Sequence, residues 1–60
     1  MSYKFEIYKD RAGEFRARFR YSGDVMFSTE GYSSKAGAKN AIESIKTNGP
    51  NAPLDDLTDD

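Results

Sequence analysis

Apolar residues and arginines alternate over residues 14–21, with the apolar side chains at odd positions and the arginines at even positions. A period of two places successive side chains on opposite faces, so this segment is predicted to be a strand with one apolar and one cationic face. The same alternation predicts a first strand over about residues 3–9 and a third over about 24–30. Short connectors containing Gly13 and Gly23 join these segments, which makes the arginine strand the centre of an antiparallel sheet.

The first connector also predicts which residues face each other. A three-residue loop ending at Gly13, with this glycine in the left-handed conformation, places Phe5 opposite Phe19 on the apolar face. The pairs on the other face are charged or aromatic: Lys4 with Arg20, Glu6 with Arg18, and Tyr8 with Arg16, on which its ring can stack.

The second connector, Ser22-Gly23, is predicted to be a two-residue turn. In the register that it sets, Met26 lies opposite Phe19 on the apolar face. Phe27 then falls beside Arg18 on the outer face, as an exposed aromatic next to cations.

A helix is predicted over about residues 34–47, because apolar side chains recur there with a 3.6-residue spacing. Ser33 or Ser34 is a suitable N-cap, and Asn48-Gly49-Pro50 ends the helix. Gly37 lowers helix propensity by up to about 1 kcal/mol relative to Ala, which suggests close packing at this position. The stripe expected to face the sheet consists of Ala38, Ala41, Ile42 and Ile45.

Sixty residues form a single domain with a marginal core. Area scaling gives apolar burial worth on the order of 90 kcal/mol, and ordering the chain costs about the same. Small folds gain further stability from disulfides, a metal or a partner chain, but the sequence contains no Cys and no His. Oligomerisation is therefore the expected source of additional stability.

The composition also limits chemistry and location. Without Cys and His the chain has no thiol nucleophile, no imidazole base and none of the usual zinc ligands, so we expect no catalytic, cofactor or metal site. No apolar run approaches the ~20 residues of a membrane span, and the first residues enter a strand pattern without a signal-peptide core. We therefore expect a cytoplasmic protein that is neither an enzyme nor bound to a membrane.

Charge is distributed unevenly along the chain. Residues 1–46 hold all nine Lys and Arg against six acids, whereas residues 47–60 hold four acids and no base. The acidic tail could mask a nucleic-acid surface, or it could lie across the basic sheet of its own or a neighbouring subunit, and the second interpretation is favoured. Taken alone, the tail resembles a disordered acidic segment in which only Leu54 and Leu57 could bury apolar surface.

The outer face of the predicted sheet is a candidate surface for a ligand or nucleic acid, because bases could stack on its rings and phosphates could bind its cations. Its residues are Lys4, Tyr8, Arg16, Arg18, Arg20 and Phe27. The alternative is a solvated face tied together by cross-strand pairs. An isoelectric point near 5.3 argues against a dedicated nucleic-acid binder. Glu6 among arginines is expected to have a lowered pKa, which suits a structural carboxylate better than a general acid.

Segments along nearly the whole chain match a known family pattern. They are Phe5-Glu6-Ile7-Tyr8-Lys9-Asp10, Phe15-Arg16-Ala17-Arg18, Ser28-Thr29-Glu30-Gly31-Tyr32-Ser33-Ser34-Lys35, Ala41-Ile42-Glu43-Ser44-Ile45-Lys46 and Asp56-Leu57-Thr58. Together they resemble the YegP-like family of small uncharacterised bacterial proteins. That family often carries Asn-Gly where this chain has Ser22-Gly23, and a smaller or aliphatic residue at the position of Phe27.

The resemblance implies a β3αβ unit, which occurs in that family as tandem repeats or as two subunits that exchange C-terminal strands within one sheet. A single-repeat chain should then be a homodimer, in which a fourth strand over about residues 53–58 places Leu54 and Leu57 at the dimer interface. The family's biochemical role is not established, so the resemblance transfers no functional residue.

The resulting hypothesis is one α+β domain over residues 1–60, with an antiparallel sheet and one helix packed on one face. We expect it to act as a homodimeric, non-catalytic structural or interaction module. The alternative is weak nucleic-acid binding through the arginine and aromatic side chains of the outer face.

Overall fold

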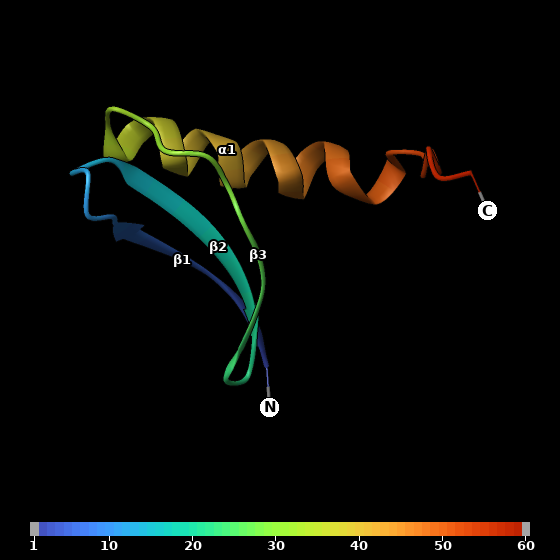
Figure 1. Cartoon of the computed structure of the whole chain (residues 1–60), viewed down its shortest axis with the longest axis horizontal. Coiled ribbons are helices and arrows are strands. Elements are labelled where there is room, and N and C mark those ends of the chain that lie inside the picture. Colours follow the sequence, from blue (N-terminus) through green and yellow to red (C-terminus); the bar gives the residue numbers. More distant parts are fainter. Residues whose placement is uncertain (1, 60) are drawn as a thin grey trace.

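A computed structural model describes residues 2–59 as a three-stranded antiparallel sheet with one α-helix lying across one of its faces (Figure 1). The elements are β1 (Tyr3–Lys9), β2 (Phe15–Tyr21), β3 (Asp24–Ser28), α1 (Lys35–Asn48) and a short 3-10 helix η1 (Gly49–Asn51). The strand order is β1-β2-β3, so the arginine strand is central. This arrangement confirms the α+β class.

The first hairpin has the predicted register, with Phe5 opposite Phe19 on the face toward α1. Its loop contains Gly13 at φ 83°, in the left-handed region that glycine adopts without steric cost. The Asp10 side chain closes the loop, because its Oδ1 accepts a hydrogen bond of 2.9 Å from the Glu14 backbone N–H. The loop residues and the apolar alternation therefore specify the same register for the hairpin of β1 and β2.

The predicted register of the second hairpin is wrong beyond its first pairs. Arg20 pairs with Val25 as expected, but the ladder then shifts and Phe19 pairs with Phe27, which leaves Met26 as the extra residue of a β-bulge. The shift turns Phe27 from the outer face to the face under α1, where its ring lies 5.7 Å from the ring of Phe19. Aromatic packing across β2 and β3 thus accompanies the break in alternation.

Regular pairing in β3 ends at Ser28, two residues before the predicted end. The chain returns to β2 at one isolated bridge, in which Phe15 and Tyr32 exchange backbone hydrogen bonds of 2.8 and 2.7 Å. Ser34 then caps α1 by accepting a 3.1 Å bond from the Gly37 N–H. A Cβ at Gly37 would lie 3.2 Å from the Tyr32 Cβ, so this glycine allows the helix start to pack closely.

The apolar core is small and lies to one side of the sheet. Within residues 2–59, three residues are buried, namely Ala17 of β2 and the α1 residues Ala38 and Ile42. The helix packs on β2 and β1, whereas all five residues of β3 are exposed. Figure 1 shows why: α1 runs over one end of the sheet and diverges from it toward the helix C-terminus.

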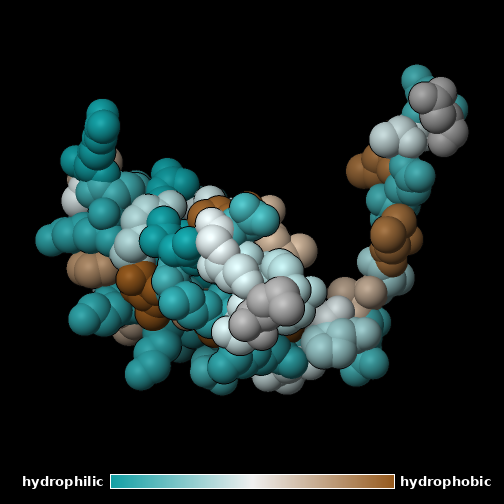
Figure 2. All heavy atoms as spheres, turned by 90° about the horizontal axis from the view of Figure 1, so that it is seen from below, coloured by the Kyte–Doolittle hydropathy of each residue, from teal (hydrophilic) through white to brown (hydrophobic). Residues whose placement is uncertain are grey.

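The C-terminal tail, residues 52–59, forms no helix or strand and leads away from the body of the fold (Figures 1 and 2). Leu54 and Leu57 are 89% and 85% exposed. The radius of gyration is 13.2 Å, whereas a compact domain of this length has about 10 Å. Residues 53–58, expected to form a fourth strand, thus pair with no strand among the described residues of a single chain.

The turn between β2 and β3 generates a testable prediction. Ser22 has φ 53°, the one positive value among the non-glycine residues that the structure describes. Because Asn tolerates the left-handed region better than Ser, we expect Ser22→Asn to raise the free energy of unfolding by about 0.5 kcal/mol and the thermal midpoint by roughly 2–4 °C. Ser33→Asn, where φ is not positive, is the control, and an equal gain in both variants would contradict this explanation.

Candidate functional site

Glu6 on β1 is the centre of a charged network on the outer face of the sheet. Its Oε1 accepts hydrogen bonds from Arg18 Nε at 2.7 Å and from Arg20 Nη1 at 3.3 Å, both on the neighbouring strand β2. Its Oε2 lies 3.3 Å from Lys4 Nζ. One carboxylate thus holds three cations from two strands, which satisfies much of the positive charge on this face.

Asp10, at the end of β1, performs the same role for the third arginine. Its Oδ2 accepts a 2.7 Å hydrogen bond from Arg16 Nε, while its Oδ1 closes the hairpin loop. Arg16 also donates from Nη1 to the Thr29 backbone carbonyl at 3.1 Å, and therefore links the first loop to the chain after β3.

The aromatic residue on this face stacks on a different arginine from the one expected. The guanidinium carbon of Arg18 lies 4.6 Å from the ring centroid of Tyr8, in a diagonal arrangement, whereas Arg16 lies directly opposite Tyr8. The reason is that Arg16 turns toward Asp10. The register that places Tyr8 opposite Arg16 is thus confirmed, whereas the predicted stacking of the ring on Arg16 is wrong, because the cation–π contact is made by Arg18.

The structure brings together five residues of the candidate surface and separates the sixth. Strand alternation places Lys4, Tyr8, Arg16, Arg18 and Arg20 on the outer face of β1 and β2. Phe27 lies on the opposite face because of the bulge. The outer face therefore offers one aromatic ring, already covered by an arginine, rather than the two rings that the sequence predicts for base stacking.

The two carboxylates that bind these arginines, Glu6 and Asp10, both have lowered pKa values. The hydrogen bond from Arg18, with further contributions from Lys4 and Arg20, lowers the pKa of Glu6 from its usual 4.5 to about 2. The hydrogen bond from Arg16 and the Glu14 N–H lower the pKa of Asp10. Each group is ionised at neutral pH and so lacks the proton that a general acid would donate.

Among residues 2–59, no group of three or more acidic side chains could hold a metal ion. None of the helices in the described part of the chain is long and apolar enough to cross a membrane.

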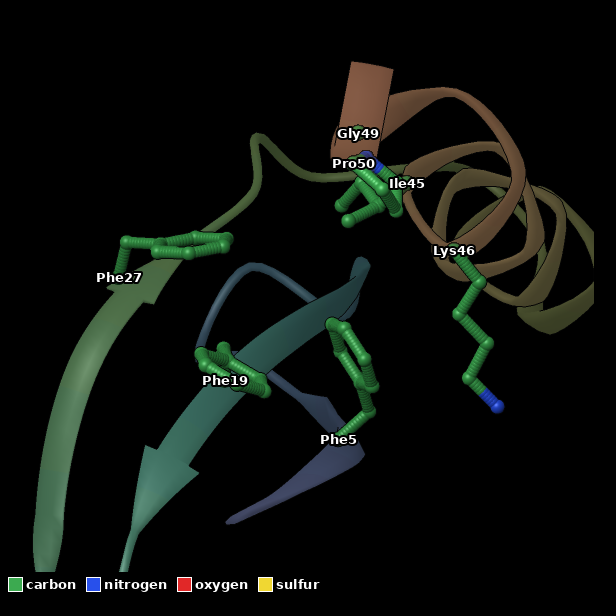
Figure 3. A pocket seen from close by; sticks show the side chains of 7 residues that line it. All are labelled: Phe5, Phe19, Phe27, Ile45, Lys46, Gly49 and Pro50. Carbon is green, nitrogen blue, oxygen red and sulfur yellow. The ribbon is translucent and has the colours of Figure 1, made fainter. Parts of the chain in front are cut away.

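The opposite face of the sheet carries a second, apolar feature, which we call the aromatic groove (Figure 3). Its volume is about 380 Å³, and it lies where α1 diverges from the sheet. One ring from each strand forms one side and the end of the helix forms the other: Phe5, Phe19 and Phe27 face Ile45, Lys46 and Pro50.

The rings of the groove form a continuous row across the sheet. Phe19 is central, with ring centroids 4.8 Å from Phe5 and 5.7 Å from Phe27. Phe27 is still 47% exposed, because α1 does not reach β3. At the edge of the groove, Lys46 Nζ lies 5.8 Å from the ring centroid of Phe5. An apolar side chain from elsewhere would find aromatic contacts here.

The groove was missed by sequence reasoning, which assigned Phe27 to the outer face and no role to Lys46 or Pro50. One signal was present: Val25-Met26-Phe27 is an uninterrupted apolar run at an edge strand, where strict alternation would place two of three side chains among charges. A bulge resolves this conflict by turning Phe27 inward.

The Glu6 network generates a prediction about pH. Because the folded-state pKa of Glu6 is lowered, its ionised form stabilises the fold above about pH 4.5, and this stabilisation is lost as the pH falls toward 2. We expect Glu6→Gln to lower the urea unfolding midpoint at neutral pH and to flatten its decline between these values. Asp10 leaves a residual slope, since its pKa is lowered as well. Glu43→Gln, at an exposed helix position, is the control, and an unchanged pH slope in E6Q would contradict the assignment.

Known proteins resemble this chain along nearly all of its length. A family model described as a domain of unknown function, DUF1508, matches residues 10–56. A UPF0339 protein of Mesorhizobium japonicum is 73% identical over 56 residues, which cover 93% of this chain and 97% of that protein.

Two solution NMR structures share the fold. That of a protein from Haloferax volcanii has a TM-score of 0.84 and 37% sequence identity, and the match covers 92% of this chain and 95% of the other. That of a protein from Agrobacterium tumefaciens has a TM-score of 0.79 and 58% identity, with 93% and 92% covered. None of these descriptions indicates a catalytic activity. The chain belongs to the DUF1508 family, the small YegP-like family of unknown function that its sequence resembles.

Proposed function

We propose that this protein is a homodimeric, non-catalytic interaction module whose C-terminal tail is exchanged between two copies. The observation that carries the proposal is the amount of apolar surface left uncovered in one chain. Three residues form the buried core, while Phe27 and both tail leucines remain exposed. Burying apolar area is the main source of stability in small domains, and a second copy of the chain can supply it.

The accessible surface supports this proposal quantitatively. One chain exposes 4908 Å², whereas a compact monomer of the same mass exposes about 3,900 Å² by the area scaling law. The excess is about 1,000 Å². A stable protein interface of standard size buries about 800 Å² on each partner. The surplus surface is therefore of the size that one dimer interface would cover.

Backbone pairing supports the exchanged strand. The sheet has two open edges, β1 and β3, and an edge strand presents unpaired N–H and C=O groups. The tail is extended at Ala52, with φ −73° and ψ 131°, and residues 52–59 pair with none of the three strands that the structure describes. A tail of this conformation suits addition to a sheet edge of a second copy, in agreement with the β3αβ dimers that the family resemblance implies.

The acidic and basic groups of the fold support a non-catalytic role. Glu6 and Asp10 are ionised and hydrogen-bonded to arginines, and the sequence contains no Cys or His. A cytoplasmic location is part of the same proposal, since a chain without cysteine suits a reducing compartment.

Molecular mass in solution tests the dimer. Size-exclusion chromatography with light scattering should give twice the 6.7 kDa chain mass for the full chain. Replacing both tail leucines in Leu54→Asp/Leu57→Asp should shift the mass toward the monomer, because charges would enter an apolar interface. A full-length chain that is folded and monomeric at millimolar concentration would contradict the proposal.

Nucleic-acid binding through the outer face is not favoured, and this can be tested separately. Each arginine of that face has a carboxylate partner, so binding phosphates would require breaking ion pairs. We expect no salt-dependent shift of short single-stranded DNA or RNA at low ionic strength. A shift that Arg18→Gln abolishes would restore the nucleic-acid hypothesis.

A further inference from the structure

The aromatic groove is a site without an occupant in the described chain. Three rings and Ile45 line it, so an aliphatic side chain would fit its chemistry. Its volume of about 380 Å³ exceeds what one leucine fills, and leaves room for the backbone on either side. Its one charged residue is Lys46, which forms no ion pair with any carboxylate among residues 2–59.

The C-terminal tail has the complementary chemistry. Side chains two positions apart share a face of an extended chain, so Leu54 and Asp56 would point to the same side and Leu57 to the other. Leu54 is 89% exposed and could fill the apolar part of the groove. The Oδ1 atom of Asp56 accepts hydrogen bonds from the Thr58 hydroxyl at 2.6 Å and from the Thr58 backbone N–H at 3.0 Å, which fix this carboxylate on the tail.

The geometry of the hinge favours a groove on a second copy over the groove of the same chain. Pro50 itself lines the groove, and from there the tail leads away from the body, as Figures 1 and 2 show. Ala52 precedes Pro53, which restricts Ala52 to the extended conformation that it has. Bringing Leu54 back into its own groove would need a reversal within four residues of Pro50, across this stiff segment. A short, stiff hinge is a feature of chains that exchange terminal segments.

We propose that Leu54 of a second copy inserts among Phe5, Phe19 and Phe27, and that Asp56 of the same tail pairs with Lys46 at the edge of the groove. This inference rests on the homodimer proposed above and specifies where its exchanged tail docks. It also explains the β-bulge, because the bulge turns the Phe27 ring toward the groove in which Leu54 would dock. It also assigns Lys46 the role of selecting an acidic tail.

Isotope-filtered NMR on the full chain tests the location directly. In an equimolar mixture of ¹³C-labelled and unlabelled protein, we expect intermolecular NOEs from the Leu54 methyl groups to the ring protons of Phe19 and Phe27. Leu57 methyl groups, at the same tail but on the opposite face, should give none to these rings and serve as the internal control. NOEs from Leu54 to the rings within one chain would overturn the proposal in favour of a folded-back tail.

A charge exchange tests the Lys46 contact. Sedimentation equilibrium should show that Lys46→Glu and Asp56→Lys each weaken the dimer about tenfold, and that the double variant K46E/D56K recovers most of the affinity. Lys39→Glu, on the same helix but away from the groove, controls for the change of net charge. Leu54→Ala should weaken the dimer by on the order of 10- to 100-fold.

The outcomes separate this inference from the dimer on which it rests. A dimer without NOEs from Leu54 to the groove, or one in which K46E/D56K is as weak as the single variants, would overturn the docking site and leave the homodimer intact. A folded monomer would overturn both. Because the NOE measurement uses the unaltered chain, it decides the docking site whatever the stability of Leu54→Ala.

Discussion

A row of three phenylalanine rings that crosses the sheet is the feature on which the rest of the structure depends. Phe19 is its centre, between Phe5 on β1 and Phe27 on β3. The helix covers the part of this face over β2 and β1 and leaves β3 uncovered. With three buried residues in the described part of the chain, the fold has little apolar burial to oppose the entropy of ordering its residues. The open end of the aromatic row is therefore the place where additional burial would stabilise the fold most.

The outer face of the sheet is held together by ion pairs, whereas the inner face makes apolar contacts. On the outer face, Glu6 and Asp10 bind all three arginines of β2 and tie the first hairpin together. Exposed ion pairs contribute little individually, but this network also neutralises a stripe that would otherwise attract anions. The inner face carries the groove, and the tail that follows Pro50 carries exposed leucines. Recognition between copies is for this reason assigned to the inner face, although the outer face is the more conspicuous one in the sequence.

The sequence was sufficient where local rules decide the structure. Apolar alternation and the left-handed position of Gly13 predicted the first hairpin, and the 3.6-residue spacing with a serine cap predicted the helix to within one residue. It was insufficient where contacts between distant elements decide. The bulge at Met26 depends on how Phe27 packs against Phe19, and the groove depends on the angle at which α1 leaves the sheet. Neither this packing contact nor this helix angle can be predicted from the spacing of residues along one segment.

The central claim is that a second copy completes the core of this fold. Thermal unfolding followed by circular dichroism over about a hundredfold range of protein concentration tests it most directly, because a chain stabilised by self-association unfolds at a temperature that depends on concentration. The midpoint should rise steadily with concentration, by several degrees over that range. A midpoint that stays the same at every concentration would show that one chain is stable by itself, and would contradict the claim.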